Sequence, residues 1–230
     1  SAIVLGVNGA FDSREDADIH TVIQGTRIVS NDICVVGAGD VTGAIRFNQY
    51  GGGEDVAIIG NTIRGPGMSA AGTAHGIDVA WNDGKDRGFK IAGNFLSDWP
   101  GCALRLDIGG SEMRENLIWN IGGDACQIDG GLSGGTPNRF VNNTFYNIGG
   151  NFARTRYDAT ATNWWINNLY VLASSGAYVC WSDGGAKNMF DACMSYFVDN
   201  TYNADGAVEG DIYWGENPIF LSTDEANPDF

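Results

Sequence analysis

The sequence has no apolar run long enough to cross a membrane as a helix, and no segment keeps the apolar spacing of an amphipathic helix. Basic residues are also few, because 13 Lys and Arg stand against 28 Asp and Glu, for a net charge of −15. Such a charge repels nucleic acids and anionic membranes. We therefore expect a nearly all-β chain with no membrane insertion and no nucleic-acid partner.

Histidine is limited to His20 and His75, which argues against a histidine-based metal site or hydrolytic triad. The five cysteines are odd in number and lack Cys-x-x-Cys spacing. Cys126 and Cys180 each stand three residues before an Asp, and we expect them to be buried thiols in preference to disulfide partners. No glycine-rich loop followed by Lys is present, so nothing indicates nucleotide chemistry.

The main feature present is a repeat, apolar-x-apolar-x-x-Asn-x-apolar, whose anchors lie 22 to 33 residues apart. This spacing is typical of one coil of a solenoid. Asn tolerates the left-handed backbone region, and its amide can bond both the backbone and the Asn of the next coil. The repeat predicts an all-β parallel β-helix of about seven coils with an internal Asn ladder. The anchors are Asn61, Asn94, Asn116, Asn143, Asn168 and Asn200.

Between the anchors, a second set of strands ends in a polar residue. Because strand side chains alternate between faces, the polar residues should face solvent while their apolar neighbours fill the interior. Asp78 and Asp83 compete for this position in the third coil. The expected solvent-facing pairs are Arg46/Asn48, Arg105/Asp107, Gln127/Asp129 and Arg156/Asp158.

The Asn phrase and the strands Gly76-Ile-Asp78 and Leu104-Arg-Leu-Asp107 resemble the right-handed parallel β-helix proteins of the pectate-lyase-like superfamily. That group includes polysaccharide lyases, glycoside hydrolases and tailspikes. The resemblance implies a right-handed solenoid whose substrate groove is lined by the strand after the most variable turn, with 64–75 and 149–152 as such turns here. It also implies a polysaccharide or cell-surface glycan as partner and an extracellular location, either secreted, on the cell surface or on a virion.

The whole chain is expected to form one domain. Residues 1–18 would be an N-terminal edge segment, 19–205 the repeated coils, and 206–230 a tail, with a truncated chain as one interpretation. Solenoid ends carry unpaired strand edges, so a homo-oligomer through the ends or faces is also expected.

Carboxyl groups in neighbouring coils should stack about 4.8 Å apart. Retaining glycosidases place their two carboxyl groups about 5 to 5.5 Å apart, and inverting ones about 6.5 to 9.5 Å. The candidate catalytic residues are Asp107, Asp129 and Asp158. The candidate substrate-binding residues are Arg46, Arg105, Gln127, Arg156, Asp78 and His75.

A lyase would use the same residues differently. Asp107 and Asp129 would hold Ca²⁺, the one cofactor indicated, while Arg105 and Arg156 would bind a substrate carboxylate in forked geometry.

Simpler interpretations remain open. The stacked Asp residues could cap turns, and His75 could be a turn residue. Trp81, Trp99, Trp119 and Trp181 could stack on sugars or fill the interior. Three functions therefore remain: glycan cleavage by a lyase or glycoside hydrolase, non-catalytic glycan binding, and a structural assembly module.

Overall fold

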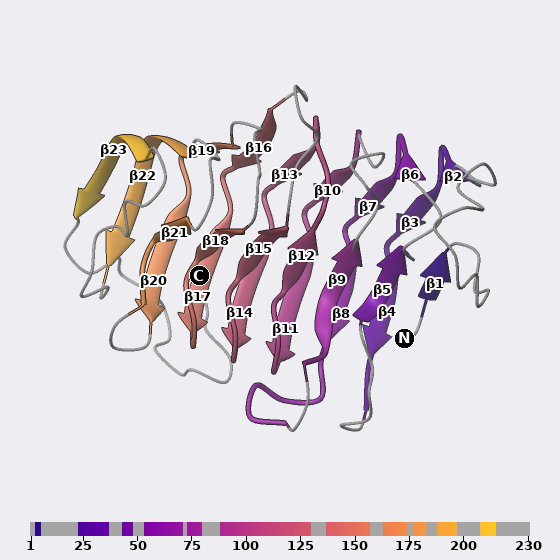
Figure 1. Ribbon diagram of the computed structural model, residues 1–230. Coiled ribbons are helices and arrows are strands. Elements are labelled where there is room, and N and C mark those ends of the chain that lie inside the picture. Colours follow the sequence, from indigo (N-terminus) through magenta and orange to yellow (C-terminus); the bar gives the residue numbers. More distant parts are fainter. Residues whose placement is uncertain are drawn as a thin grey trace, which may run out of the picture.

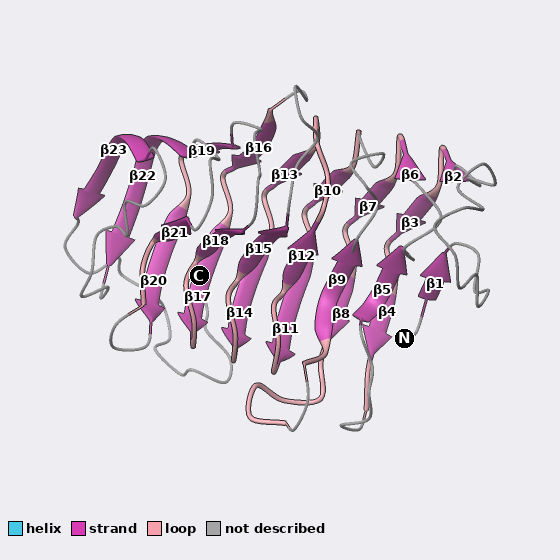
Figure 2. Cartoon of the chain, viewed as in Figure 1, coloured by secondary structure: helices cyan, strands magenta, loops and turns pink. Residues whose placement is uncertain are grey.

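The computed structural model describes residues 3–5, 23–36, 43–47, 53–70, 73–79, 88–129, 137–156, 163–173, 177–182, 188–196 and 208–214. Every regular element in these ranges is a strand (Figures 1 and 2). Nothing in them forms a helix long and apolar enough to cross a membrane.

One stack of strands is a seven-stranded parallel sheet, with one strand from each coil. Its strands are, in spatial order, β1 (Ile3–Leu5), β5 (Gly43–Phe47), β9 (His75–Val79), β12 (Leu104–Leu106), β15 (Cys126–Asp129), β18 (Ala153–Arg156) and β21 (Cys180–Ser182).

The remaining faces belong to a fourteen-stranded sheet made of two stacks that the long strand β22 (Asn188–Tyr196) joins. The first stack holds β3 (Arg27–Val29), β7 (Ala57–Ile59), β10 (Lys90–Ala92), β13 (Glu112–Arg114), β16 (Asn138–Val141) and β19 (Asn163–Ile166). The second holds β4 (Asp32–Cys34), β8 (Thr62–Arg64), β11 (Phe95–Trp99), β14 (Leu117–Ile121), β17 (Thr144–Ile148) and β20 (Leu169–Ala173). The short strands β2 (Ile23–Gln24) and β6 (Gly53–Glu54) pair separately.

Each coil visits the three stacks in turn, so the strands stack side by side along an elongated solenoid (Figure 1). This arrangement confirms the predicted all-β parallel β-helix. Pairing extends beyond residues 19–205, because β1 pairs with β5 and β23 (Val208–Trp214) pairs with β22.

The Asn ladder is confirmed at the turn between the two stacks of the large sheet. Asn94 Nδ2 donates to the Asn116 side-chain oxygen at 3.0 Å and to the Ile58 carbonyl at 2.9 Å. Its own Oδ1 accepts from the backbone and side-chain nitrogens of Asn61 at 2.9 and 3.0 Å. Each buried amide is therefore satisfied by the coils on either side.

The left-handed residue of each turn is the one before the ladder Asn, and not the Asn itself as the sequence analysis suggests. Gly60, Gly93 and Glu115, each preceding a ladder Asn, have φ between 55° and 63°. The ladder Asn itself bonds to its neighbours, and the preceding residue makes the turn.

Two residues outside the predicted set extend the ladder within the described part of the chain. Asn31 starts it by donating to the Asn61 side chain, and Cys193 follows Asn168, whose Nδ2 lies 3.8 Å from the Cys193 sulfur. The expected last anchor, Asn200, lies outside the described residues. A thiol can replace the amide here because sulfur accepts a weak hydrogen bond.

A second buried polar ladder follows the turn that leads into the first stack of the large sheet. Asn138 Nδ2 donates to Asn163 Oδ1 at 3.2 Å, and Asn163 Nδ2 donates to Asn188 Oδ1 at 3.3 Å. Ser111 opens this ladder, donating its backbone N–H to Asn138. The sequence interpretation missed it because the first position is Ser instead of Asn.

The interior between the sheets is apolar and aromatic. Phe140 and Trp165 stack with ring centroids 3.8 Å apart, and Trp99 is fully buried. Cys126 and Cys180 are buried free thiols in the same inward column, as the sequence predicts.

The turns into the seven-stranded sheet are tight in the middle coils. Residues 122–125 and 149–152 each connect a strand of the second stack to the sheet in four residues. A Cβ on Gly122 would overlap the Met68 carbonyl oxygen, and one on Gly149 would overlap that of Gly122. The prediction that 149–152 is a variable loop is therefore wrong, because glycine allows neighbouring turns to stack in backbone contact.

Candidate functional site

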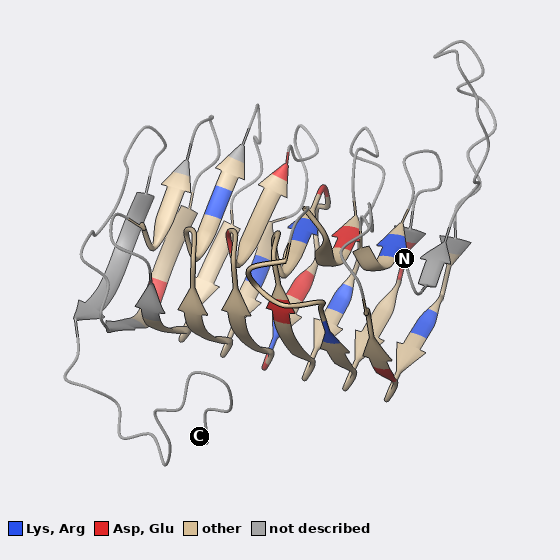
Figure 3. Ribbon diagram, turned by 90° about the horizontal axis from the view of Figure 1, so that it is seen from below, with Lys and Arg blue, Asp and Glu red and all other residues tan. Residues whose placement is uncertain are grey.

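A column of side chains runs along the outer face of the seven-stranded sheet. In-register pairing joins Arg46 to Asp78, Asp78 to Arg105, and Arg105 to Gln127. The next coils add Arg154 and Trp181. We call these six residues the outer column. Basic and acidic positions lie on neighbouring strands (Figure 3).

Asp78 lies between two arginines and is fully buried, with a side-chain exposure of 0%. Its Oδ2 lies 3.6 Å from Arg46 Nε, and its Oδ1 lies 3.8 Å from Arg105 Nη1. Neither carboxylate oxygen accepts a hydrogen bond from the described chain. Burial raises the pKa of Asp78 to about 6, against the opposing effect of Arg105 and Arg46.

Asp129 is held by two neighbours. Arg105 Nε donates to its Oδ2 at 3.1 Å, and Gln127 Nε2 lies 2.8 and 2.7 Å from its two oxygens. Arg105 therefore contacts both Asp78 and Asp129, which lie two coils apart.

Asp107 and Asp129 occupy adjacent coils as predicted. Leu106 pairs with Ile128, and Asp107 and Asp129 are the residues that directly follow this pair. The Asp107 backbone N–H donates to the Val79 carbonyl at 2.8 Å, which continues the backbone pairing of β12 with β9 by one residue. Asp107 is partly exposed, whereas Asp129 is buried.

The predicted alignment of the next coil is wrong by two residues. Asp129 pairs with Arg156, and Gln127 pairs with Arg154. Asp158, which lies outside the described residues, was expected to continue the acidic column, but Arg156 takes that place. The tight turn fixes the register, because Gly149-Gly150 follows Gly122-Gly123 by the same number of residues as Arg154 follows Gln127.

The expectation that the outer face is open to solvent is also wrong in part. Asp78, Gln127, Asp129 and His75 are buried, and Arg46 and Arg105 are partly exposed. Strand alternation predicts which face a side chain takes, but the long side chains of adjacent coils, about 4.8 Å away, help to cover it.

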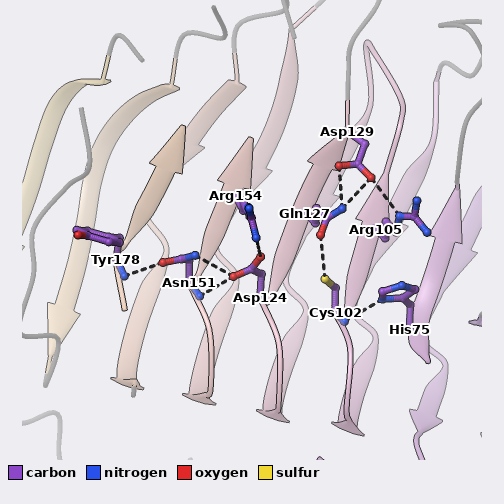
Figure 4. A network of polar contacts seen from close by, with 9 residues as sticks. All are labelled: His75, Cys102, Arg105, Asp124, Gln127, Asp129, Asn151, Arg154 and Tyr178. Carbon is purple, nitrogen blue, oxygen red and sulfur yellow. Dashed lines mark hydrogen bonds and ion pairs between the residues drawn. The ribbon is translucent and has the colours of Figure 1, made fainter. Parts of the chain in front are cut away.

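A stack of turn residues runs beside the outer column (Figure 4). Asp124 Oδ1 accepts from the backbone N–H and side-chain nitrogen of Asn151 at 2.8 and 2.9 Å, and Asn151 Oδ1 accepts from the Tyr178 N–H at 3.0 Å. Arg154 Nη1 lies 3.7 Å from Asp124 Oδ2. We call His75, Cys102, Asp124, Asn151 and Tyr178 the turn stack.

His75 is held in its neutral form at the start of the turn stack. Its Nδ1 accepts the Cys102 backbone N–H at 2.9 Å, so Nε2 carries the proton. Burial, assisted by Arg105, lowers the pKa of His75 to about 4. Its hydrogen bond to the Cys102 backbone favours a structural role for His75, which is the first residue of β9 and not a turn residue.

The described residues do not fit a calcium site. Ca²⁺ takes six to eight oxygen ligands, but both Asp129 oxygens already face Gln127 or Arg105. The Arg105 guanidinium would also repel a cation beside Asp129. No group of three His, Cys, Asp or Glu side chains suited to a metal occurs in the described ranges.

The structure brings together six of the nine predicted site residues, namely Arg46, His75, Asp78, Arg105, Gln127 and Asp129, with Asp107 alongside. The side chain of Arg156 is not described. The sequence interpretation missed Asp124, Asn151, Arg154 and Tyr178 as neighbours of this region. Counting from the glycine pairs would have identified Arg154, because these pairs set the register.

Comparison of the chain with protein-family models, with curated proteins and with solved structures gives no match.

Proposed function

We propose that the protein is an extracellular polysaccharide-cleaving enzyme of the glycoside hydrolase type, related to the pectate-lyase-like superfamily, whose catalytic pair is Asp107 and Asp129. The observation that supports this proposal most is that Asp107 and Asp129 directly follow the paired residues Leu106 and Ile128 in adjacent coils. Their strands are about 4.8 Å apart. That spacing suits the carboxyl pair of a retaining glycosidase, which is about 5 to 5.5 Å.

The environments of the two residues suit different roles. Asp129 is oriented by Arg105 and Gln127, which prepares its carboxylate to attack the anomeric carbon. Asp107 is partly exposed and would donate its proton to the leaving glycosidic oxygen. The Asp129–glycosyl ester would then be hydrolysed by a water that Asp107 deprotonates, restoring both groups.

Asp78 and Arg46 act as positioning residues in this proposal. Arg105 contacts Asp78 at 3.8 Å and Asp129 at 3.1 Å, so the buried Asp78 carboxyl anchors the guanidinium that orients Asp129.

The test is release of reducing ends from a panel of defined neutral and acidic polysaccharides. Asp129→Asn and Asp107→Asn should each reduce turnover by several orders of magnitude while circular dichroism stays unchanged. Asp32→Asn, in an exposed ion pair with Arg64, is the matched control and should keep full activity. Full activity in Asp129→Asn would contradict the proposal, as would products that are exclusively unsaturated sugars.

Non-catalytic glycan binding is the second candidate, and the burial of Asp129 favours it. Its oxygens are engaged within the protein, as expected for a structural ion-pair network. Binding of a glycan at the outer column without turnover, at any pH tested, would select this function.

A further inference from the structure

Two aromatic rings lie beside each other at the last coil of the seven-stranded sheet. Trp181 is the final residue of the outer column, and Tyr178 is the final residue of the turn stack. Their ring centroids are 5.2 Å apart and the ring planes are inclined at 59°. Both residues are partly exposed, unlike Trp99, which fills the interior.

The polar atom of the Trp181 ring is shielded from solvent. The indole Nε1 is enclosed and has no hydrogen-bond partner in the described structure, although the residue as a whole is partly exposed. A ligand would therefore meet an apolar ring surface and not a hydrogen-bond donor. Sugar rings present C–H groups on one face and suit such a surface.

Arg154 provides a cation next to this ring. It is the direct strand partner of Trp181, and its side chain is 34% exposed. Its contact with Asp124 Oδ2, at 3.7 Å, is longer than a charge-assisted hydrogen bond of about 2.7 to 2.9 Å. The exposed part of the Arg154 side chain lets its guanidinium reach a carboxylate on a ligand.

The turn stack holds the backbone of Tyr178 in place. Tyr178 is tied to Asn151 through its backbone N–H, and Asn151 is tied to Asp124 (Figure 4). Ligand binding would then require little ordering of this turn, which favours affinity.

From these contacts we propose that Trp181, Tyr178 and Arg154 form a subsite for a uronate residue of an acidic polysaccharide. The sugar ring stacks on Trp181 and its carboxylate pairs with Arg154. The inference rests on the proposed function, because the same glycan chain would extend along the outer face toward Asp129. Asp129 lies two strands from Trp181, roughly 10 Å away, so one oligosaccharide can contact both.

The test measures calorimetric binding of defined uronate oligosaccharides, built from galacturonate, mannuronate or glucuronate, and of their carboxyl-reduced forms. The Asp129→Asn protein serves as the background, so that cleavage does not interfere. Trp181→Ala should weaken binding of the uronate form about 3- to 10-fold. Trp164→Ala is the matched control, because Trp164 is partly exposed on the fourteen-stranded sheet and should leave affinity unchanged.

Arg154→Gln separates the charge from the stacking. It should weaken binding of the uronate form about 10-fold or more and leave binding of the reduced form unchanged. Circular dichroism checks that each variant is folded. If Trp181→Phe keeps the uronate affinity of the background protein, stacking is supported, because a smaller aromatic ring remains.

The outcomes separate this subsite from the catalytic proposal. Equal uronate affinity in Trp181→Ala and the background protein would overturn the subsite, as would the absence of uronate binding while a neutral glycan is cleaved. Binding that depends on Trp181 and Arg154, in a protein that cleaves no polysaccharide, would support the subsite and overturn the hydrolase function.

Discussion

Arg105 Nε lies 3.1 Å from Oδ2 of Asp129, across the pairing of β12 with β15. Asp129, the proposed nucleophile, is therefore ion-paired with an arginine from the preceding coil. The same guanidinium faces the buried Asp78 at 3.8 Å, so Arg105 contacts two carboxyl groups, and Arg46 also faces Asp78 at 3.6 Å.

Replacing Arg105 with Gln should destabilise the protein near pH 7 by on the order of 3 kcal/mol, because two buried carboxylates each lose one cationic partner, and only Asp78 keeps a second one, Arg46. The loss should shrink below about pH 6, where Asp78 takes up a proton in the folded chain. Urea unfolding near pH 7 and below pH 6 measures this loss of stability. Arg64→Gln, in an exposed pair, is the control and should change stability little. An equal loss at both pH values would contradict this explanation.

Replacing Asp78 with Asn should change how stability depends on pH. Burial raises the pKa of Asp78 to about 6 from an ordinary 3.8, so the unfolded chain loses this proton first as pH rises. The stability of the unsubstituted protein should therefore fall between about pH 4 and pH 6 through this residue. Relative to it, Asp78→Asn should gain on the order of 3 kcal/mol across that window.

His75 acts in the opposite direction. Burial lowers its pKa to about 4, so its contribution to stability is lost as pH falls from about 6.5. Because His75 is present in both proteins, comparison of Asp78→Asn with the unsubstituted chain isolates the carboxyl. Parallel stability curves for the two proteins would show that Asp78 is not perturbed by burial.

Replacing Asn94 with Ala should cost several kcal/mol, at about 1 to 3 kcal/mol for each buried group left without a partner. The change removes the acceptor of two Asn61 nitrogens and the donor to Asn116. Asn142→Gly is the control, because the side-chain bond of Asn142 to Asn167 is exposed and glycine tolerates its φ of 54°, so stability should change by less than about 1 kcal/mol. Equal urea-unfolding midpoints for Asn94→Ala and the unsubstituted protein would show that the ladder does not stabilise the coils.

The cysteines should differ in reactivity toward a maleimide. Cys34 is exposed, whereas Cys102, Cys126, Cys180 and Cys193 are buried. Burial also raises the pKa of the Cys180 thiol to about 12, which removes the reactive thiolate. Mass spectrometry should show one rapid label on the native protein and five after unfolding. Cys34→Ser, with no rapid label, is the check; rapid labelling of a second site would disagree with the structure.

Much of the fold could be predicted from the Asn repeat, because a buried turn needs the same amide in every coil. The rung that follows Asn168 could not, since Cys193 fills that ladder position without resembling Asn. The second ladder was also missed, because Ser111 and Asn138 satisfy the same backbone need with different side chains. Several side chains can solve one hydrogen-bonding problem, so a repeat search finds only the commonest.

The sequence by itself determined that the chain winds into stacked coils and that Asp107 and Asp129 become neighbours, because the strand period and the repeat are local properties. Only the tertiary structure decided that Arg156, and not Asp158, pairs with Asp129 in the next coil, because stacked glycine turns set the register of that coil. It also decided that Asp78 is buried between two arginines, since burial depends on side chains contributed by neighbouring coils.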